Sequence, residues 1–279
     1  MEQESVAFIG GGNMTRAIIG GLLEDGFSPA FISVAEPMAS QRDTLTDAMP
    51  GVFISEDNDE VVARANNVVL AVKPQVISGV CRELAAAVQK TKPLIISIAA
   101  GPRIADIDHW LGGGNAIARV MPNQPALLKK GVSGLFANDK TSAEQLQTAR
   151  TIMSAVGPVV TVPVEDDIDA VTAVSGSGPA YFYLLIDMIA KSGERLGLSE
   201  SAARDLAIET AVGATKLAQD SGDSMDELIA RVRSPGGTTA AALDSLLNDG
   251  VRDIFATALT AARDRATELA DQAHNDSQD

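Results

Sequence analysis

The residues most able to do chemistry lie in two glycine-containing stretches near opposite ends of the chain. Residues 234–239 read Ser-Pro-Gly-Gly-Thr-Thr and stand where a new helix is expected to begin. Backbone N–H groups at a helix N-terminus, together with nearby hydroxyls, form a pocket for a small anion such as a carboxylate. We therefore predict that a small acid binds at Ser234, Gly237, Thr238 and Thr239.

Residues 10–15 read Gly-Gly-Gly-Asn-Met-Thr and follow an apolar run at residues 6–9. They supply the first two glycines of the dinucleotide fingerprint G-x-G-x-x-G, between a strand and a helix expected at residues 14–23. One glycine permits the tight turn, and another lets a pyrophosphate approach the helix start. The alternative is a flexible loop without a ligand. The predicted cofactor-binding residues here are Gly10, Gly11, Gly12, Asn13 and Met14.

Glu36 ends the second apolar run, where an acidic residue usually binds the ribose diol of NAD. A carboxylate there repels the 2′-phosphate of NADP, but Arg42 follows one or two helical turns later, and its positive charge could offset this repulsion. The alternative for Glu36 is a solvated charge at a strand end. The sequence therefore leaves both NAD(H) and NADP(H) open as the cofactor.

Three later apolar runs also end in glycine or polar residues. Ligands of open parallel sheets bind outside the carboxyl ends of the strands, so these ends are expected to meet in one crevice. The alternative for Lys73 is that it is only a charged surface residue and does not belong to a site. The predicted cofactor-binding residues at these ends are Ala71, Val72, Lys73, Pro74, Ala99, Ala100 and Asn123.

The sequence lacks the residues that several kinds of catalysis require. Of the two histidines, His109 lies in a helical segment and His274 in the polar tail, away from the strand ends. The chain has no G-x-S-x-G elbow, no Walker lysine and no zinc-spaced cluster, and we predict no metal site. Hydride transfer from a nicotinamide remains, because the cofactor carries the difficult step.

Composition narrows the class of protein. The 279 residues suffice for two domains, and 46% hydrophobic with only 4% aromatic residues predicts an aliphatic core. A net charge of −15 argues against a nucleic-acid partner. The one cysteine, Cys81, is predicted to be a buried apolar residue rather than a nucleophile. No apolar run is long enough for a membrane span or resembles a signal peptide, so we expect a cytoplasmic protein without a membrane partner.

Short apolar runs alternate with helical segments up to about residue 162, and strand signals then stop. This order predicts an α/β fold with a Rossmann-type, doubly wound parallel sheet in residues 1–162 and an all-helical domain in residues 163–279. The expected strands are residues 6–9, 31–35, 52–54, 68–72, 94–98 and 116–120, with 133–136 and 159–162 as extensions.

The helical part has recognisable helix starts. Ser177-Gly178-Pro179 is typical of an N-cap followed by proline, and Ser199 and Ser224 begin two further helices, the latter with a capping box. Residues 180–190 are apolar almost all round, which predicts burial against a second subunit. Residues 238–250 and 251–270 complete the set, and the polar residues 271–279 are expected to fray.

Taken together, the motifs resemble the Δ1-pyrroline-5-carboxylate reductase family, which catalyses the last step of proline biosynthesis. The resemblance covers both domains in the family's order, and its one departure is Gln124, where the family usually has threonine. The motifs that carry it are Ile9-Gly10-x-Gly12-Asn13-Met14, Ala71-Val72-Lys73-Pro74-Gln75, Met121-Pro122-Asn123, residues 169–181 (Asp-Ala-Val-Thr-Ala-Val-Ser-Gly-Ser-Gly-Pro-Ala-Tyr) and residues 234–239.

The resemblance implies a Rossmann domain and a helical domain that dimerises, with several dimers able to form a larger ring such as a decamer. It implies NADPH or NADH as the hydride donor. Asn58 matches a position that contacts the adenosine side of the cofactor. Glu165, Thr238 and Thr239 match positions at or near the substrate or product.

These parts suggest a mechanism. The N–H groups of Gly237 and Thr238, with the Ser234 hydroxyl, hold the carboxylate of 1-pyrroline-5-carboxylate, and the Thr239 hydroxyl faces the ring nitrogen. An imine is basic enough to be partly protonated near neutral pH, so no histidine or cysteine is needed to reduce it to proline.

Two other functions stay open. A β-hydroxyacid dehydrogenase also has a Gly-x-Gly-Asn-Met turn, but it needs a lysine base on the first long helix of its second domain, where only Lys191 is nearby. A non-catalytic NAD(P)-binding regulator would bind the cofactor without consuming it.

Overall fold

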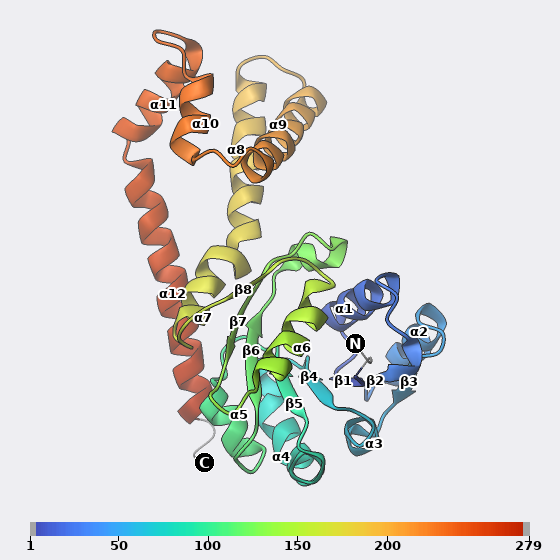
Figure 1. The fold of residues 1–279 in the computed structure, drawn as a ribbon. Coiled ribbons are helices and arrows are strands. Elements are labelled where there is room, and N and C mark those ends of the chain that lie inside the picture. Colours follow the sequence, from blue (N-terminus) through green and yellow to red (C-terminus); the bar gives the residue numbers. More distant parts are fainter. Residues whose placement is uncertain (1–3, 276–279) are drawn as a thin grey trace. The chain divides into compact units, whose positions relative to one another are not determined.

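The structure is a computed structural model that describes residues 4–275 (Figure 1). Contacts divide the chain into two compact units. The first holds residues up to 177 together with those from 262 onward, and the second holds Gly178–Ala261. Each unit is described by itself below.

The first unit is built on one eight-stranded sheet with the strand order β3-β2-β1-β4-β5-β6-β7-β8. All neighbouring strands are parallel except β6 and β7, which are antiparallel. Every strand expected from the sequence is present. The strands are β1 (Val6–Ile9), β2 (Ile32–Ala35), β3 (Phe53–Ser55), β4 (Asn67–Leu70), β5 (Leu94–Ser97), β6 (Ile117–Met121), β7 (Ser133–Ala137) and β8 (Val159–Thr161).

The antiparallel β6–β7 pair departs from the expected all-parallel sheet. Only residues 122–132 connect the two strands, and they hold a single short 3-10 helix. A parallel neighbour needs a longer crossover, usually with an α-helix, so this connection returns the chain in the opposite direction.

Helices cover both faces of the sheet (Figure 1). They are α1 (Asn13–Glu24), η1 (Pro29–Phe31), α2 (Ala39–Ala48), α3 (Asn58–Val62), α4 (Pro74–Thr91), α5 (Ile104–Trp110), η2 (Gln124–Leu128), α6 (Ala143–Ser154), α7 (Asp167–Val171) and the π-helical turn η3 (Thr172–Gly176).

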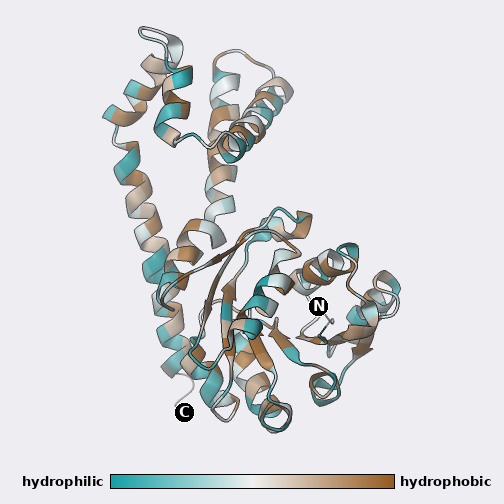
Figure 2. Cartoon of the chain, viewed as in Figure 1, coloured by the Kyte–Doolittle hydropathy of each residue, from teal (hydrophilic) through white to brown (hydrophobic). Residues whose placement is uncertain are grey.

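The central strands alternate their side chains between two apolar layers. Val6 and Phe8 of β1 belong to the layer under α1 and α6, whereas Ala7 and Ile9 belong to the layer under α3, α4 and α5. This period of two follows from the pleat of a strand. Burial on both sides explains why these strands are almost entirely hydrophobic (Figure 2).

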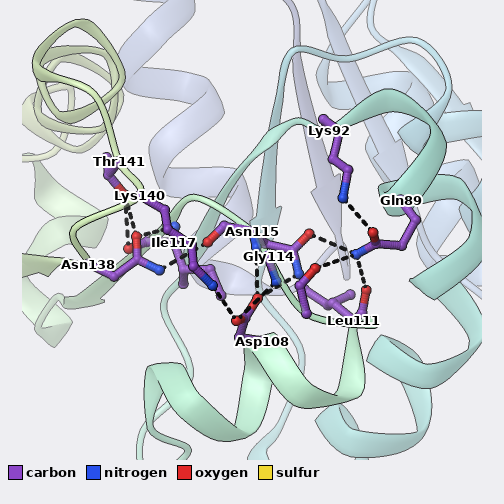
Figure 3. Close-up of polar contacts among 11 residues, drawn as sticks. Gln89, Lys92, Asp108, Leu111, Gly114, Asn115, Ile117, Asn138, Lys140 and Thr141 are labelled. Atoms are coloured by element: carbon purple, nitrogen blue, oxygen red, sulfur yellow. Dashed lines mark hydrogen bonds and ion pairs between the residues drawn. The ribbon is translucent and has the colours of Figure 1, made fainter.

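A polar network fixes the loop that leads into β6 (Figure 3). Asp108 Oδ1 accepts hydrogen bonds from the backbone N–H and the side-chain amide of Asn115, both at 2.8 Å. Gln89 donates to the carbonyls of Leu111 and Gly113 at 2.7 and 2.9 Å. These contacts satisfy the loop's backbone groups and set where β6 begins.

The helical segment before the second unit is more continuous than expected. The Ser177 N–H donates to the Thr172 carbonyl at 2.8 Å, which is the i to i−5 spacing of a π-helix. Ser177 has φ −83° and ψ −18°, so it closes η3 in a helical conformation and is not an extended N-cap. Pro179 does lie in the first turn of the next helix, as predicted.

The second unit is entirely helical, as expected. Ser199 and Ser224 cap their helices through hydrogen bonds to the N–H groups of Ala202 and Glu227. The helices are α8 (Gly178–Arg195), α9 (Glu200–Asp220), α10 (Met225–Val232), α11 (Thr238–Asn248) and the first part of α12 (Val251–Asn275).

The end of α12 belongs to the first unit. The Thr267 hydroxyl donates to Asp169 at 2.9 Å, and Arg103 pairs with Asp271 at 3.1 Å. His274 Nδ1 lies 2.5 Å from Asp106 Oδ1. The expectation that the chain frays from residue 271 is therefore wrong as far as Asn275, and residues 276–279 lie outside the described residues.

The contacts do not divide the chain where the sequence analysis did. Residues 163–177 and the end of α12 group with the sheet. The assignment of cofactor binding to residues 1–162 and of substrate binding and dimerisation to residues 163–279 stays a prediction. Among residues 4–275, no helix is both long and apolar enough to cross a membrane.

Candidate cofactor and substrate sites

The turn after β1 requires glycine at its first position. Gly10 has φ +101°, and a Cβ there would lie 2.8 Å from the Ala71 carbonyl oxygen. The Gly10 N–H donates to the Ala35 carbonyl at 2.8 Å, and Thr15 Oγ1 donates to the Gly10 carbonyl at 2.6 Å. Thr15 thus secures the turn from the third place of the fingerprint.

The start of α1 fits the pyrophosphate of a dinucleotide. Gly12 is the N-cap, and no side chain caps the helix or places an acid in its first turn. A Cβ on Gly12 would meet nothing within 4 Å, so the space above the helix start is open. The N–H groups near Asn13 and Met14 are therefore available to an anion, which the helix dipole also favours.

Glu36 is part of this cradle and not a solvated charge. The residue is only 8% exposed, and its Oε2 accepts a hydrogen bond from the Gly11 N–H at 3.0 Å. Its Oε1 accepts from the Met38 N–H, also at 3.0 Å. The carboxylate is thus fixed between the glycine turn and the end of β2.

The other predicted cofactor residues also lie in the first unit, at carboxyl ends of its strands. Ala71 and Val72 are half-buried after β4, Lys73 is exposed and Pro74 opens α4. Ala99 is buried and Ala100 exposed after β5. Because β1, β4, β5 and β6 are sheet neighbours, these ends meet along one edge. Asn58 begins α3, where the Asp57 side chain caps the helix.

Asn123 is tied into the protein by both ends of its amide. Its Nδ2 donates to the Ser175 carbonyl in η3 at 3.1 Å, and its Oδ1 accepts from the Val132 N–H at 3.0 Å. Asn123 therefore links the loop after β6 to the π-helical turn. π-Helical turns of this kind are frequent at functional sites.

The sequence analysis missed Arg119. This buried side chain of β6 pairs with Glu165 at 3.1 Å and with Asp169 at 3.4 Å, and it donates to the Gly101 carbonyl at 3.1 Å. Glu165 also accepts from the Ile104 N–H at 2.8 Å. An arginine inside an otherwise apolar strand was the available signal, because a buried charge needs partners.

In the second unit, the Ser-Pro-Gly-Gly-Thr-Thr segment forms the start of α11. Gly237 is the N-cap, and the helix start has no side-chain cap. The Gly237 N–H donates to the Ser234 carbonyl at 3.0 Å, and a Cβ on Gly237 would lie 2.3 Å from Ser234 Oγ. Thr238 is exposed and Thr239 half-buried. A hydroxyl and a helix N-terminus therefore share one small space, as an anion pocket requires.

Neither the cysteine nor the possible metal ligands among the described residues indicate a further site. Burial raises the pKa of the Cys81 thiol to about 12, so it is inert at neutral pH and packs as the predicted apolar residue. Within the described part of the chain, histidine, cysteine and acidic side chains form no group of three able to hold a metal ion.

Comparison with known proteins identifies the family. Residues 165–269 match the model described as pyrroline-5-carboxylate reductase dimerisation, and residues 5–101 match that described as NADP oxidoreductase, coenzyme F420-dependent. A pyrroline-5-carboxylate reductase from Pseudomonas aeruginosa is 46% identical over 98% of this chain and 99% of its own. The chain belongs to the pyrroline-5-carboxylate reductase family.

Solved members of the pyrroline-5-carboxylate reductase family have the same fold. The Coxiella burnetii enzyme matches with a TM-score of 0.92 and 41% identity over 96% of this chain and 98% of its own. The Plasmodium falciparum enzyme, solved with NADP bound, matches with a TM-score of 0.83 and 26% identity over 97% and 99%. The expected fold class, the NAD(P)H-dependent oxidoreductase class and a homo-oligomerising domain are thereby confirmed.

Proposed function

We propose that this chain reduces the C=N bond of 1-pyrroline-5-carboxylate with hydride from NAD(P)H and releases proline. The observation that carries the proposal is the uncapped start of α11, where Ser234 Oγ lies beside the helix N-terminus, an arrangement suited to binding a carboxylate. The uncapped start of α1 supplies the matching pyrophosphate cradle. Membership of the family supports the same reaction.

The substrate site needs few groups. The N–H groups of Gly237 and Thr238, with the Ser234 hydroxyl, bind the carboxylate and so orient the ring. The Thr239 hydroxyl hydrogen-bonds the ring nitrogen and stabilises the amine as it forms. The nicotinamide, when bound, supplies the hydride. The imine is basic enough to be partly protonated near neutral pH, so the site needs no histidine or cysteine to protonate it.

Glu165 remains a proposed substrate-binding residue. Its carboxylate is held by Arg119 and by the Ile104 N–H, so it is presented in one orientation rather than free to rotate. We also propose the predicted larger assembly of dimers, such as a decamer, and a cytoplasmic location. No nucleic-acid or membrane partner is proposed.

The β-hydroxyacid dehydrogenase alternative gains no support from Lys191. Its side chain is 64% exposed, and its ammonium pairs with Asp187 one turn earlier on α8, at 2.8 Å. A lysine that acts as a general base must be presented to its substrate, whereas Lys191 is exposed and already paired with a carboxylate of its own helix.

A cofactor-oxidation assay tests the function. The protein is mixed with NADH or NADPH and racemic pyrroline-5-carboxylate, and absorbance and proline are followed together. We expect cofactor loss and proline formation in equal amounts. Faster oxidation of a 3-hydroxy acid with NAD(P)⁺ would favour the dehydrogenase instead, and cofactor binding without turnover would indicate a regulator.

A further inference from the structure

The choice between NADH and NADPH depends on the charges at the end of β2. There the carboxylate of Glu36 is almost fully buried and accepts hydrogen bonds from the N–H groups of Gly11 and Met38. A carboxylate has about four lone-pair positions, so it can still accept a hydrogen bond from a ribose hydroxyl. Because two backbone donors hold it, it cannot turn away from an incoming 2′-phosphate.

Arg42, the side chain that could offset this charge, is already engaged. Its guanidinium donates to the carbonyls of Glu36 and Pro37 at 3.0 and 2.8 Å. It also pairs with the Glu56 carboxylate at 2.8 Å. The charge of Arg42 is therefore met by Glu56, and its donors point to backbone oxygens instead of a phosphate.

Arg16 is a second cation beside the glycine turn. Its Nε donates to the Gly11 carbonyl at 3.3 Å, and its Nη2 bonds the side chain of Gln41. These contacts hold the guanidinium between α1 and α2. Glu36 and Glu56 together thus offset the charges of Arg16 and Arg42, and these two side chains leave no surplus positive charge for a phosphate of about −1.5 to −2.

We propose that this chain uses NADH in preference to NADPH, and that Glu36 sets the preference by binding the ribose diol and repelling a 2′-phosphate. The inference rests on the proposed function only in taking a nicotinamide dinucleotide as the cofactor. The proposed preference for NADH differs from the cofactor seen in the Plasmodium falciparum relative, which was solved with NADP bound.

The test measures binding without any substrate. The full-length protein is titrated calorimetrically with NADH and NADPH, and with the fragments ADP and adenosine 2′,5′-bisphosphate. We expect Kd to be at least about tenfold lower for NADH than for NADPH, with the same order for the fragments. Equal or tighter binding of NADPH by the wild-type protein would overturn the proposal.

Glu36→Gln isolates the charge, because glutamine has the same size and keeps an acceptor for one backbone N–H. We expect it to bind NADPH about tenfold more tightly and so reduce or reverse the preference. Glu83→Gln, which removes an exposed carboxylate from α4, is the matched control and is expected to change neither Kd. A folded Glu36→Gln variant with an unchanged Kd ratio would contradict the assignment to Glu36.

Glu36→Asp keeps the charge and should keep the preference for NADH even if Glu36→Gln does not fold. Failure of the two proposals can be told apart. If neither nucleotide binds, both the proposed function and this inference fall. If both bind and NADPH binds better, only this inference falls. If NADH binds better but pyrroline-5-carboxylate is not reduced, only the proposed function falls.

Discussion

At the scale of single residues, the proposed chemistry depends on Thr239. This side chain lies in the first turn of α11, close to Ser234 and Gly237, where we propose that the substrate carboxylate binds. A hydroxyl there can hydrogen-bond the ring nitrogen without taking part in an acid–base relay. Its contribution should therefore appear in the chemical step rather than in folding.

Thr239→Val removes the hydroxyl and keeps the shape of the side chain. We expect kcat to fall about 10- to 10³-fold, as for loss of one hydrogen bond in a transition state. Steady-state kinetics with pyrroline-5-carboxylate measure the change. Thr239→Ser is the control and should retain most of the activity, whereas an unchanged kcat in Thr239→Val would remove Thr239 from the mechanism.

Features that depend on backbone conformation were easier to predict from the sequence than contacts of side chains. The tight turn at Gly10 and the helix start at Gly12 were predicted because they leave a recognisable glycine spacing, whereas the role of both residues in cofactor binding stays a prediction. The contact of Glu36 with the Gly11 N–H and the pairing of Arg119 with Glu165 could not be predicted, because each joins groups that are far apart in the chain. Their surroundings are set by tertiary packing and not by local pattern.

At the scale of elements, the start of α1 is the proposed binding surface of the cofactor. Gly12→Ala adds a methyl group that meets no protein atom within 4 Å, so the fold should not change. The methyl group would instead occupy the space that a pyrophosphate needs. We expect Kd for the preferred cofactor to rise at least about tenfold at an unchanged melting temperature.

Gly20→Ala is the matched control for Gly12→Ala. It lies on the same helix, and its Cβ would also meet nothing within 4 Å. It should leave Kd unchanged and slightly raise stability, because alanine favours a helix interior over glycine. Wild-type affinity in Gly12→Ala would show that the cofactor does not approach this helix start.

Asp108 makes the loop before β6 sensitive to acid. Burial raises the pKa of Asp108, but the Asn115 N–H, Lys140, the Asn115 amide and the Gly114 N–H outweigh it and hold the pKa below the ordinary 3.8. The ionised carboxylate therefore stabilises the fold above pH 3.8, and this contribution is lost as the pH falls through the lower folded-state pKa.

Asp108→Asn should therefore cost about 1–3 kcal/mol at neutral pH and little in strong acid. Urea unfolding of both proteins across this pH range measures the difference. Asp139→Asn, which changes an exposed carboxylate on the neighbouring turn, is the control and should follow the wild type. The same free-energy gap at every pH would show that the charge of Asp108 is not what stabilises the loop.

At the scale of the whole molecule, the second unit buries few hydrophobic side chains within one chain. Within Gly178–Ala261, the buried hydrophobic side chains are all alanines, namely Ala190, Ala203, Ala207 and Ala240. Larger side chains such as Leu184 and Met188 of α8 are 59% and 47% exposed. Apolar surface on this scale marks an interface, in agreement with the match to a dimerisation domain.

Leu184→Glu combined with Met188→Glu places charge one turn apart on α8. We expect the protein to shift from an oligomer toward monomer, because burying two carboxylates in an apolar interface is costly. Sedimentation velocity measures the mass. Leu128→Glu is the control, since Leu128 is 78% exposed on η2 in the first unit, and it should keep the oligomer. An oligomer that survives the double change would place the interface elsewhere.

The sequence showed this architecture in outline. The apolar alternation predicted all eight strands, and the all-round apolar segment at residues 180–190 predicted a partner. The expectation of an all-parallel sheet was wrong at β7, which runs antiparallel to β6, although the short connection between the two expected strands was already a signal of this direction. The last turn of α12, after residue 270, was also missed, because its polar side chains Asp271 and His274 bond to Arg103 and Asp106 instead of forming an apolar face.

The most direct test of the central claim follows the hydride itself. The protein is given pyrroline-5-carboxylate and a nicotinamide cofactor deuterated at its transferable position, and the proline formed is examined by mass spectrometry and NMR. We expect one deuterium per proline, on the carbon of the former C=N bond, and less proline from Thr239→Val at the same protein concentration. Absence of proline, or proline without deuterium at that carbon, would contradict the account.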